Sequence, residues 1–230
     1  MSRDSDVNTK DAILEAACLL FAEYGYDGVR TRMVAEVAKV NIASIHYHFG
    51  SKESLYIAAF RVAFQSQSSL TIDDLLAGRP DLLDTDAGKA EAVRAIIFDF
   101  FDKRLNHCEE WKPRLILREI CQNSSVHATL VEEVFIPGSQ NFSNLCKRIC
   151  PENDEIDSYI LENIPTGQLS FYVLAKNTLE TRFDKETLVV LRERMVKTTV
   201  RALLFLMDLP IPEDLGGRNR VKHCLNKGAD

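Results

Sequence analysis

The stretch TRMVAEVAKVNIASIHYHFGSKESLY, from Thr31 to Tyr56, decides the fold that this sequence predicts. After Thr31, a residue that suits a helix N-cap, apolar residues recur at helical spacing. The second half favours another short helix from about Ile42 to Phe49, capped by Asn41 and closed by Gly50. Two short helices joined by a few residues, after a longer helix, are typical of a helix-turn-helix.

Helices are also expected on both sides of this stretch. Before it, the apolar residues of TKDAILEAACLLFAEYGYDG recur at three- and four-residue steps. Asn8 or Thr9 can cap the start of that helix, and Gly25 suits its left-handed end. After it, Ser51 is placed to cap a fourth helix that continues through Ala63. We therefore expect a three-helix N-terminal domain over residues 1–50.

Residues 51–208 continue the helical pattern and show no credible run of strands, so the predicted fold class is all-α. A loop is expected from about Asp73 to Gly88, and a kink or short break at Pro137. Two long helices are expected near the end, Ile156–Ala175, interrupted by the sequence IPTG, and Asp184–Asp208. Both are apolar over more than one stripe, which favours burial against neighbours or a partner subunit. Residues 209–230 read as a loosely held polar tail.

Composition narrows the class of protein. The chain has 230 residues, of which 46% are hydrophobic, and this excludes a disordered or fibrous chain. Its formal charge of −6 means that any contact with DNA must come from a local basic patch. The polar first residues and the lack of a long apolar run predict a cytoplasmic protein with no membrane segment. In that reducing compartment the scattered cysteines are expected to be buried thiols.

The opening stretch resembles the DNA-binding signature of TetR-family transcriptional regulators. The shared features are a threonine-led helix, a tight turn, a helix ending in ring-x-ring-Phe, and then Gly-Ser-Lys-Glu; the resemblance covers roughly Thr9 to Phe60. More loosely, LILREICQ and VFIPGSQNFSNLCKRI are similar to the ligand-binding domain of the CecR-like subgroup. The resemblance implies an N-terminal DNA-binding domain and, over residues 51–208, a helical bundle that binds ligand and dimerises. It also implies a homodimer, a palindromic double-stranded operator and a small-molecule effector, with no cofactor and no metal.

Candidate DNA contacts follow from the physics of the motif. The start of its second helix meets base edges, and the rings and cations around it meet phosphates. Ile45 and Phe49 face inward and hold that helix in place. Lys52 would meet a phosphate at the start of the fourth helix. The full set of candidates is Arg30, Thr31, Arg32, Asn41, Ile42, Ala43, Ser44, His46, Tyr47, His48 and Lys52.

Two residues depart from the family pattern, and one has a competing role. Lys39 stands where most family members carry glycine, so the turn is expected to be strained or differently shaped. His46 replaces the first tyrosine of the ring pattern, and its contact is pH-sensitive in principle. Asn41 can hydrogen-bond a base unless its side chain is used as the helix cap.

Other readings of the polar residues stay open. His46 and His48 are badly spaced for joint metal ligation, whereas Cys146 and Cys150 can share one helix face as a metal or redox pair. Core packing is the plain alternative to a ligand cavity lined by Phe98, Phe101, Trp111, Arg118, Cys121, Tyr159, Phe171 and Tyr172. Arg118 is expected to pair with Glu119 or with a ligand carboxylate. No nucleophile–base pattern, phosphate loop or zinc spacing stands out, so the sequence does not predict an enzyme. A ligand-binding or thiol-sensing module without a DNA role is the main rival.

Overall fold

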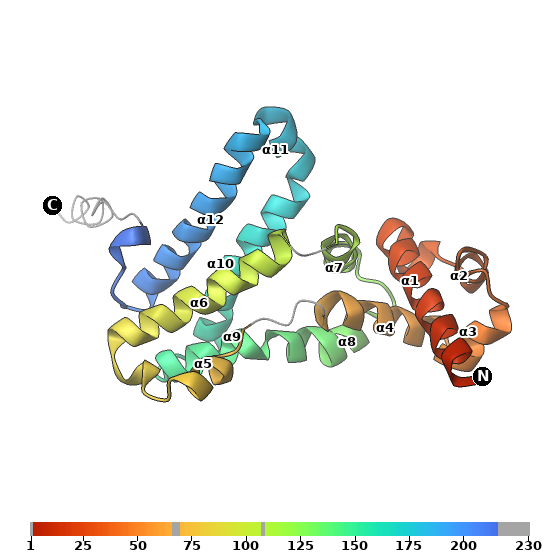
Figure 1. Cartoon of the computed structure of the whole chain (residues 1–230), viewed down its shortest axis with the longest axis horizontal. Helices are drawn as coiled ribbons and strands as arrows, with labels where there is room; N and C mark the ends of the chain where they lie inside the picture. The colour runs from red at the N-terminus through yellow and green to blue at the C-terminus, as the bar shows by residue number, and fades with distance from the viewer. Residues whose placement is uncertain (1, 66–69, 107–108, 216–230) are drawn as a thin grey trace. The chain divides into compact units, whose positions relative to one another are not determined.

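The computed structural model describes residues 2–65, 70–106 and 109–215 of the chain (Figure 1). These residues form helices and connections, with no strand among them, which confirms the all-α prediction. The chain divides into two compact units. Unit 1 comprises Met1–Ser68 and Asp102–Gln140, and unit 2 comprises Ser69–Phe101 and Asn141–Asp230.

The N-terminal part of unit 1 has the expected order of helices. They are α1 (Ser2–Gly28), α2 (Thr31–Ala38), α3 (Ile42–Phe49) and α4 (Lys52–Gln65). α1 begins earlier than predicted, so the expected caps at Asn8 and Thr9 are wrong; no proline or glycine in residues 2–8 stops the helix. Gly25 has the expected positive φ of 72°, but it kinks α1 instead of ending it, because the helix continues to Gly28.

Side-chain caps fix where α3 and α4 begin. The Asn41 Oδ1 atom accepts a hydrogen bond from the Ala43 amide at 2.9 Å, and Ser51 Oγ accepts one from the Ser54 amide at 3.0 Å. Both caps were predicted. The expected cap at Thr31 is wrong, because Arg30 occupies the N-cap position of α2 and makes no side-chain cap bond.

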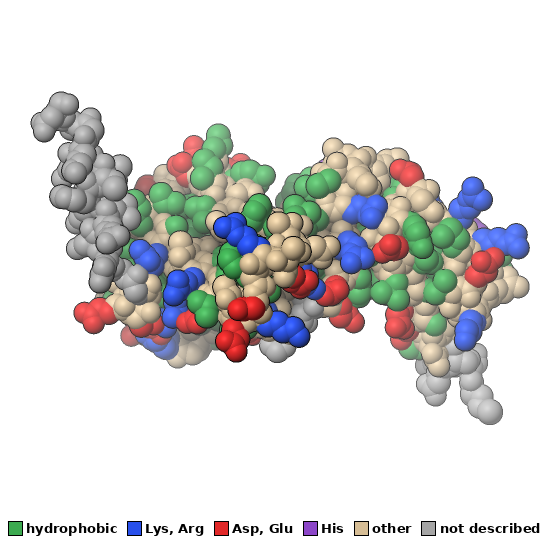
Figure 2. Space-filling model, turned by 90° about the horizontal axis from the view of Figure 1, so that it is seen from above, with side chains coloured by type: hydrophobic (Ala, Val, Ile, Leu, Met, Phe, Trp, Pro, Cys, Tyr) green, Lys and Arg blue, Asp and Glu red, His purple; other side chains and the backbone are tan. Residues whose placement is uncertain are grey.

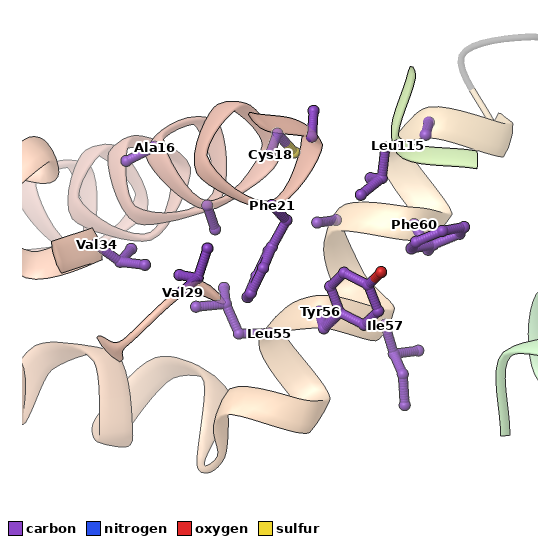
Figure 3. Packing of buried hydrophobic residues seen from close by; sticks show 14 of the residues in the cluster. Ala16, Cys18, Phe21, Val29, Val34, Leu55, Tyr56, Ile57, Phe60 and Leu115 are labelled. Carbon is purple, nitrogen blue, oxygen red and sulfur yellow. The ribbon is translucent and has the colours of Figure 1, made fainter. Parts of the chain in front are cut away.

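Aromatic side chains fill the core of unit 1 between α1, α4 and the helices that follow (Figure 3). Phe21 of α1 meets Tyr56 of α4 edge-on with ring centroids 4.7 Å apart, and Tyr56 meets Phe60 at 5.1 Å. Leu115, from α7 (Trp111–Gln122), is buried against them. Burying each such side chain contributes about 1.5–3 kcal/mol. The compact unit therefore extends well beyond the residues 1–50 expected for the DNA-binding domain.

One continuous helical stretch runs from His127 to Ile149. It consists of α8 (His127–Leu130), a π-helical turn η2 (Val131–Phe135) and α9 (Ile136–Ile149). The break expected at Pro137 is absent, and the π-helical turn lies directly before this proline. Proline lacks an amide hydrogen and crowds the carbonyl four residues earlier, here Glu133. The wider turn relieves this conflict without ending the helix.

Unit 2 contains two long helices joined by a short one. These are α10 (Glu155–Leu174), α11 (Lys176–Arg182) and α12 (Lys185–Leu206). The interruption expected at IPTG is wrong, because α10 runs through the buried Pro165. The cap at Asp184 is confirmed: its Oδ1 atom accepts a hydrogen bond from the Thr187 amide at 2.7 Å.

The rest of unit 2 corrects two further expectations. The loop predicted over 73–88 contains α5 (Ile72–Gly78) and η1 (Leu82–Asp84), and Thr71 and Asp74 form a capping box for α5. α6 (Asp86–Leu105) follows. The predicted loose tail is wrong for its first residues, since Leu209 and Leu215 are buried and Asp214 pairs with Arg94 beside η3 (Glu213–Leu215). The remaining residues of that tail, 216–230, lie outside the described part.

No helix in the described ranges has the length and apolar character needed to cross a bilayer.

Candidate nucleic-acid interface

α3 presents a mixed polar and apolar surface to solvent. Ile45 is buried and Phe49 is half-buried, as predicted, and they attach α3 to the core of unit 1. Tyr47, on the side away from Ile45, is 77% exposed, and Ile42, at the start of the helix, is 41% exposed. The exposed candidates on this helix and its cap are Asn41, Ile42, Ala43, His46 and Tyr47, while Ser44 and His48 are half-buried.

The rings of α3 are held by local contacts. Tyr47 and His48 meet edge-on with their centroids 4.9 Å apart. The Nδ1 atom of His46 lies 3.0 Å from the carbonyl oxygen of Gly50. A carbonyl oxygen only accepts, so Nδ1 carries the hydrogen of this bond. The other ring nitrogen of His46 therefore donates only when the ring is protonated.

Lys52 lies at the start of α4 with its ammonium group over the ring of Tyr26, 4.2 Å from the ring centroid. This position is half-buried, and burial lowers the pKa of the ammonium group. Contact with the negative face of an aromatic ring restricts where the cation can lie. Lys52 is therefore a fixed rather than a freely moving charge.

Arginines flank the start of α2. Arg30 is its exposed N-cap residue, Thr31 is half-buried, and Arg32 pairs with Glu36 across one helical turn at 3.2 Å. Because both partners of that pair are exposed, it contributes little stability and can exchange for another partner. Figure 2 shows Lys and Arg side chains, with some acidic ones among them, over the part of unit 1 that holds α2 and α3.

The turn between α2 and α3 places Lys39 in the left-handed region, with φ 57° and ψ 42°. Its amide closes the end of α2 by hydrogen-bonding to the carbonyl oxygens of Ala35 and Glu36. The strained turn predicted from the missing glycine is therefore present. A residue with a Cβ atom costs about 1–2 kcal/mol in this conformation.

The eight residues proposed for a ligand cavity are divided between the two units. Trp111, Arg118 and Cys121 lie on α7 in unit 1, and the other five lie on α6 and α10 in unit 2. Arg118 donates from Nη2 to the carbonyl oxygen of Glu23 at 2.9 Å rather than pairing with Glu119. Phe101 is buried, whereas Tyr159 and Phe171 are 65% and 67% exposed. The remaining two, Phe98 and Tyr172, are half-buried.

The cysteines of the described residues are mostly buried thiols. Cys18, Cys146 and Cys150 are buried and Cys121 is exposed. Burial raises the pKa of the Cys18 and Cys146 thiols to about 12, which disfavours the reactive thiolate. Within the described ranges no group of three or more His, Cys, Asp or Glu side chains is arranged to hold a metal ion. Cys108 and Cys224 lie outside these ranges.

A buried polar contact behind α3 was not predicted from the sequence. The hydroxyl of Tyr56, on α4, donates to Glu119 Oε2 on α7 at 2.7 Å. The two residues are 63 positions apart, and no local pattern links such distant positions.

The helices that carry this surface match a known protein family. Residues 13–59 match the family model described as "Bacterial regulatory proteins, tetR family". The α1–α4 region of this chain is therefore similar to the DNA-binding region of TetR-family regulators. It is 24% identical over 165 residues to the Probable HTH-type transcriptional regulator YttP of Bacillus subtilis, a match that covers 69% of this chain and 71% of YttP.

Two further proteins are similar to parts or all of this chain. The HTH-type transcriptional repressor NicS of Pseudomonas putida is 35% identical over 95 residues, covering 40% of this chain and 42% of NicS. The crystal structure of NalD from Pseudomonas aeruginosa, the secondary repressor of the MexAB-OprM multidrug efflux pump, shares the fold. It superposes with a TM-score of 0.56 at 21% identity, covering 88% of this chain and 96% of NalD.

Proposed function

We propose that this protein is a ligand-responsive transcriptional repressor that binds a palindromic operator as a homodimer. The observation that carries this proposal is the exposed surface of α3, with its capped start, its polar rings and cations on either side. The similar proteins named as repressors support repression, rather than activation, of transcription. The proposal also places the protein in the cytoplasm and requires no cofactor or metal.

In the proposed complex, α3 enters the major groove, which admits one α-helix. Ile42 and Ala43 touch thymine methyl groups, and Asn41 and Ser44 hydrogen-bond to base edges. The residues that meet phosphates are Arg30, Thr31, Arg32, His46, Tyr47, His48 and Lys52. These contacts fix the register of the protein, and the contacts at the start of α3 select the sequence.

The proposed dimer interface is the apolar face of α10. Exposed Ile156, Ile160, Phe171 and Leu174 recur along one side of this helix, and Gly167 lies on the same side with open space around it. A contiguous apolar surface of this kind favours association with another protein surface. α12 adds exposed apolar side chains to the interface, among them Val190 and Phe205. Figure 2 shows hydrophobic side chains on the surface of unit 2.

The proposed switch is an effector-driven change in the separation of the two DNA-binding heads. The effector shifts this equilibrium only by binding one arrangement better than the other. The side chains proposed to line its site are Phe98, Phe101 and Tyr172 in unit 2. The exposed Tyr159 and Phe171 fit the dimer interface better. The similarity of Leu115–Gln122 and Val134–Ile149 to the CecR-like subgroup remains a proposal about the class of ligand-binding domain.

Binding to DNA from upstream of the protein's own gene tests the proposal. The wild-type protein should protect one palindromic site whose half-sites lie about 34–36 Å apart, and affinity should fall with salt. Ser44→Ala should change the preferred base within each half-site while leaving the salt dependence intact. A protein that binds an effector but shows no preference for any upstream fragment would instead be a helical ligand-binding module.

A further inference from the structure

The contact between Tyr56 and Glu119 belongs to a buried polar network in unit 1. Glu119 is 2% exposed, and its carboxylate accepts hydrogen bonds from four donors. Tyr56 Oη donates to Oε2 at 2.7 Å, and the amide and hydroxyl of Ser124 lie 3.1 and 3.0 Å from Oε1. The Nδ1 atom of His127 lies 3.0 Å from the same oxygen. An unpaired buried carboxylate is costly, so these donors together hold the carboxylate in one position.

The network reaches the surface through Tyr26. The rings of Tyr26 and Tyr56 are tilted against each other, with their centroids 5.0 Å apart. The same Tyr26 ring lies under the ammonium group of Lys52. Burial and the hydrogen bond to Glu119 raise the pKa of Tyr56, so its hydroxyl stays a donor.

The two residues of α4 that contact Tyr26 are one helical turn apart. Lys52 and Tyr56 are four residues apart on α4 and therefore lie on the same face, against Tyr26. A shift of the Tyr56 ring moves the surface on which Tyr26 rests, and a shift of Tyr26 moves the position favoured by Lys52. The carboxylate on α7 is thus linked to a cation at the start of α4 through two rings in tilted contact.

We propose that Glu119 is a positioning residue for DNA binding, which sets the place of the Lys52 ammonium group through Tyr56 and Tyr26. The inference rests on the proposed function, because it assigns Lys52 a phosphate of the operator. Glu119 is too deeply buried to touch DNA itself. Its role is to fix the geometry of a charge that does.

The experiment uses Tyr56→Phe, which removes one hydroxyl and keeps the ring, with Glu119→Gln as a second variant of unchanged size. Operator affinity is measured over a range of salt concentrations below the melting temperature of each variant. Tyr56→Phe should bind about three- to ten-fold more weakly, the scale of one ordinary hydrogen bond. Its salt slope should fall towards that of Lys52→Ala, since each lost phosphate contact lowers the slope by about 0.9. The control is Tyr24→Phe, which removes the hydroxyl of an exposed tyrosine on α1.

A double-variant cycle separates positioning from simple destabilisation. In a Lys52→Ala background, Tyr56→Phe should cause no further loss of affinity, because the cation it positions is gone. An equal loss in both backgrounds, or a salt slope unchanged from wild type, would overturn the inference while leaving DNA binding intact. If wild type binds no upstream DNA, or Lys52→Ala changes neither affinity nor slope, the proposed function of this surface fails, and the inference fails with it.

Discussion

Two helices of this protein expose large side chains, and the chemistry of those side chains differs. On α3 the most exposed large residue is Tyr47, an aromatic ring with a hydroxyl, and polar His46 and Asn41 are exposed beside it. On α10 the exposed residues Ile156, Ile160 and Phe171 carry no polar atom in their side chains. The polar side chains of α3 suit the hydrated, charged surface of DNA. The apolar side chains of α10 suit burial against another protein surface. The exposed fraction of a side chain therefore does not indicate what kind of partner it binds. The polar or apolar character of its exposed atoms does.

The largest expected effect comes from placing charge on the apolar face of α10. Ile160→Glu combined with Phe171→Glu should convert the proposed dimer to monomers and weaken operator binding by about a hundred-fold or more, because two linked heads bind far more tightly than one. Sedimentation analysis gives the oligomeric state and a DNA titration gives the affinity. Leu19→Glu, on the exposed side of α1, is the control. A doubly charged variant that stays dimeric would place the interface elsewhere.

The second-largest effect concerns the phosphate contacts proposed for α3 and the start of α4. Replacing Tyr47 and Lys52 by alanine should weaken binding to every DNA sequence by about ten- to a hundred-fold and lower the salt slope, since phosphate contacts carry no sequence information. Affinity for operator and for unrelated DNA is measured at several salt concentrations. Tyr24→Ala with Lys185→Ala removes the same residue types from exposed positions on α1 and α12. Unchanged affinity in the Tyr47–Lys52 variant would contradict the phosphate assignment.

A smaller effect concerns the strained turn that precedes α3. Lys39→Gly should raise the free energy of unfolding by about 1 kcal/mol, because glycine adopts the left-handed conformation without steric cost. Lys39→Ala also removes the charge but keeps the Cβ atom, so it should give no such gain. Urea denaturation of both variants separates backbone strain from charge, and equal stability in the two would rule out strain as the cause.

The smallest effect is a pH dependence in unit 2. Burial raises the pKa of Glu162, on α10, above its ordinary value of 4.5, so the folded state holds this proton more tightly than the unfolded chain. Its contribution to stability is present below pH 4.5 and is lost as pH rises through the raised pKa. Glu162→Gln should therefore flatten the decline in stability over that range. Thermal melts at several pH values measure it, and exposed Glu180→Gln should leave the decline in place.

Features set by neighbouring residues were predicted in part, since the caps expected at Thr31 and at Asn8 or Thr9 were wrong. The caps at Asn41, Ser51 and Asp184 and the left-handed Gly25 each depend on a few adjacent positions, and the structure contains all of them. The capping box of Thr71 and Asp74 depends on equally local residues, so the loop expected there was an avoidable error. The exposed rings of α3, which carry the proposed function, followed from the same kind of pattern.

Features set by packing were not predicted. Local rules predict that Pro137 and Pro165 interrupt their helices, yet a π-helical turn precedes Pro137 and α10 continues through the buried Pro165. The candidate ligand residues lie on several helices, and the sequence does not reveal the compact unit to which each helix belongs. The pairing of Tyr56 with Glu119 likewise depends on how α4 and α7 meet, which is a property of the whole unit.

The cap at the start of α3 also limits which bases the proposed complex can recognise there. Since the Asn41 oxygen is engaged by the Ala43 amide, the group left to face the groove is the side-chain NH₂, which only donates. A bidentate contact with adenine needs both the oxygen and the nitrogen of an asparagine, so Asn41 is unsuited to it. Purine N7, guanine O6 and thymine O4 are the atoms that remain open to this residue, and an operator position facing Asn41 should discriminate against cytosine.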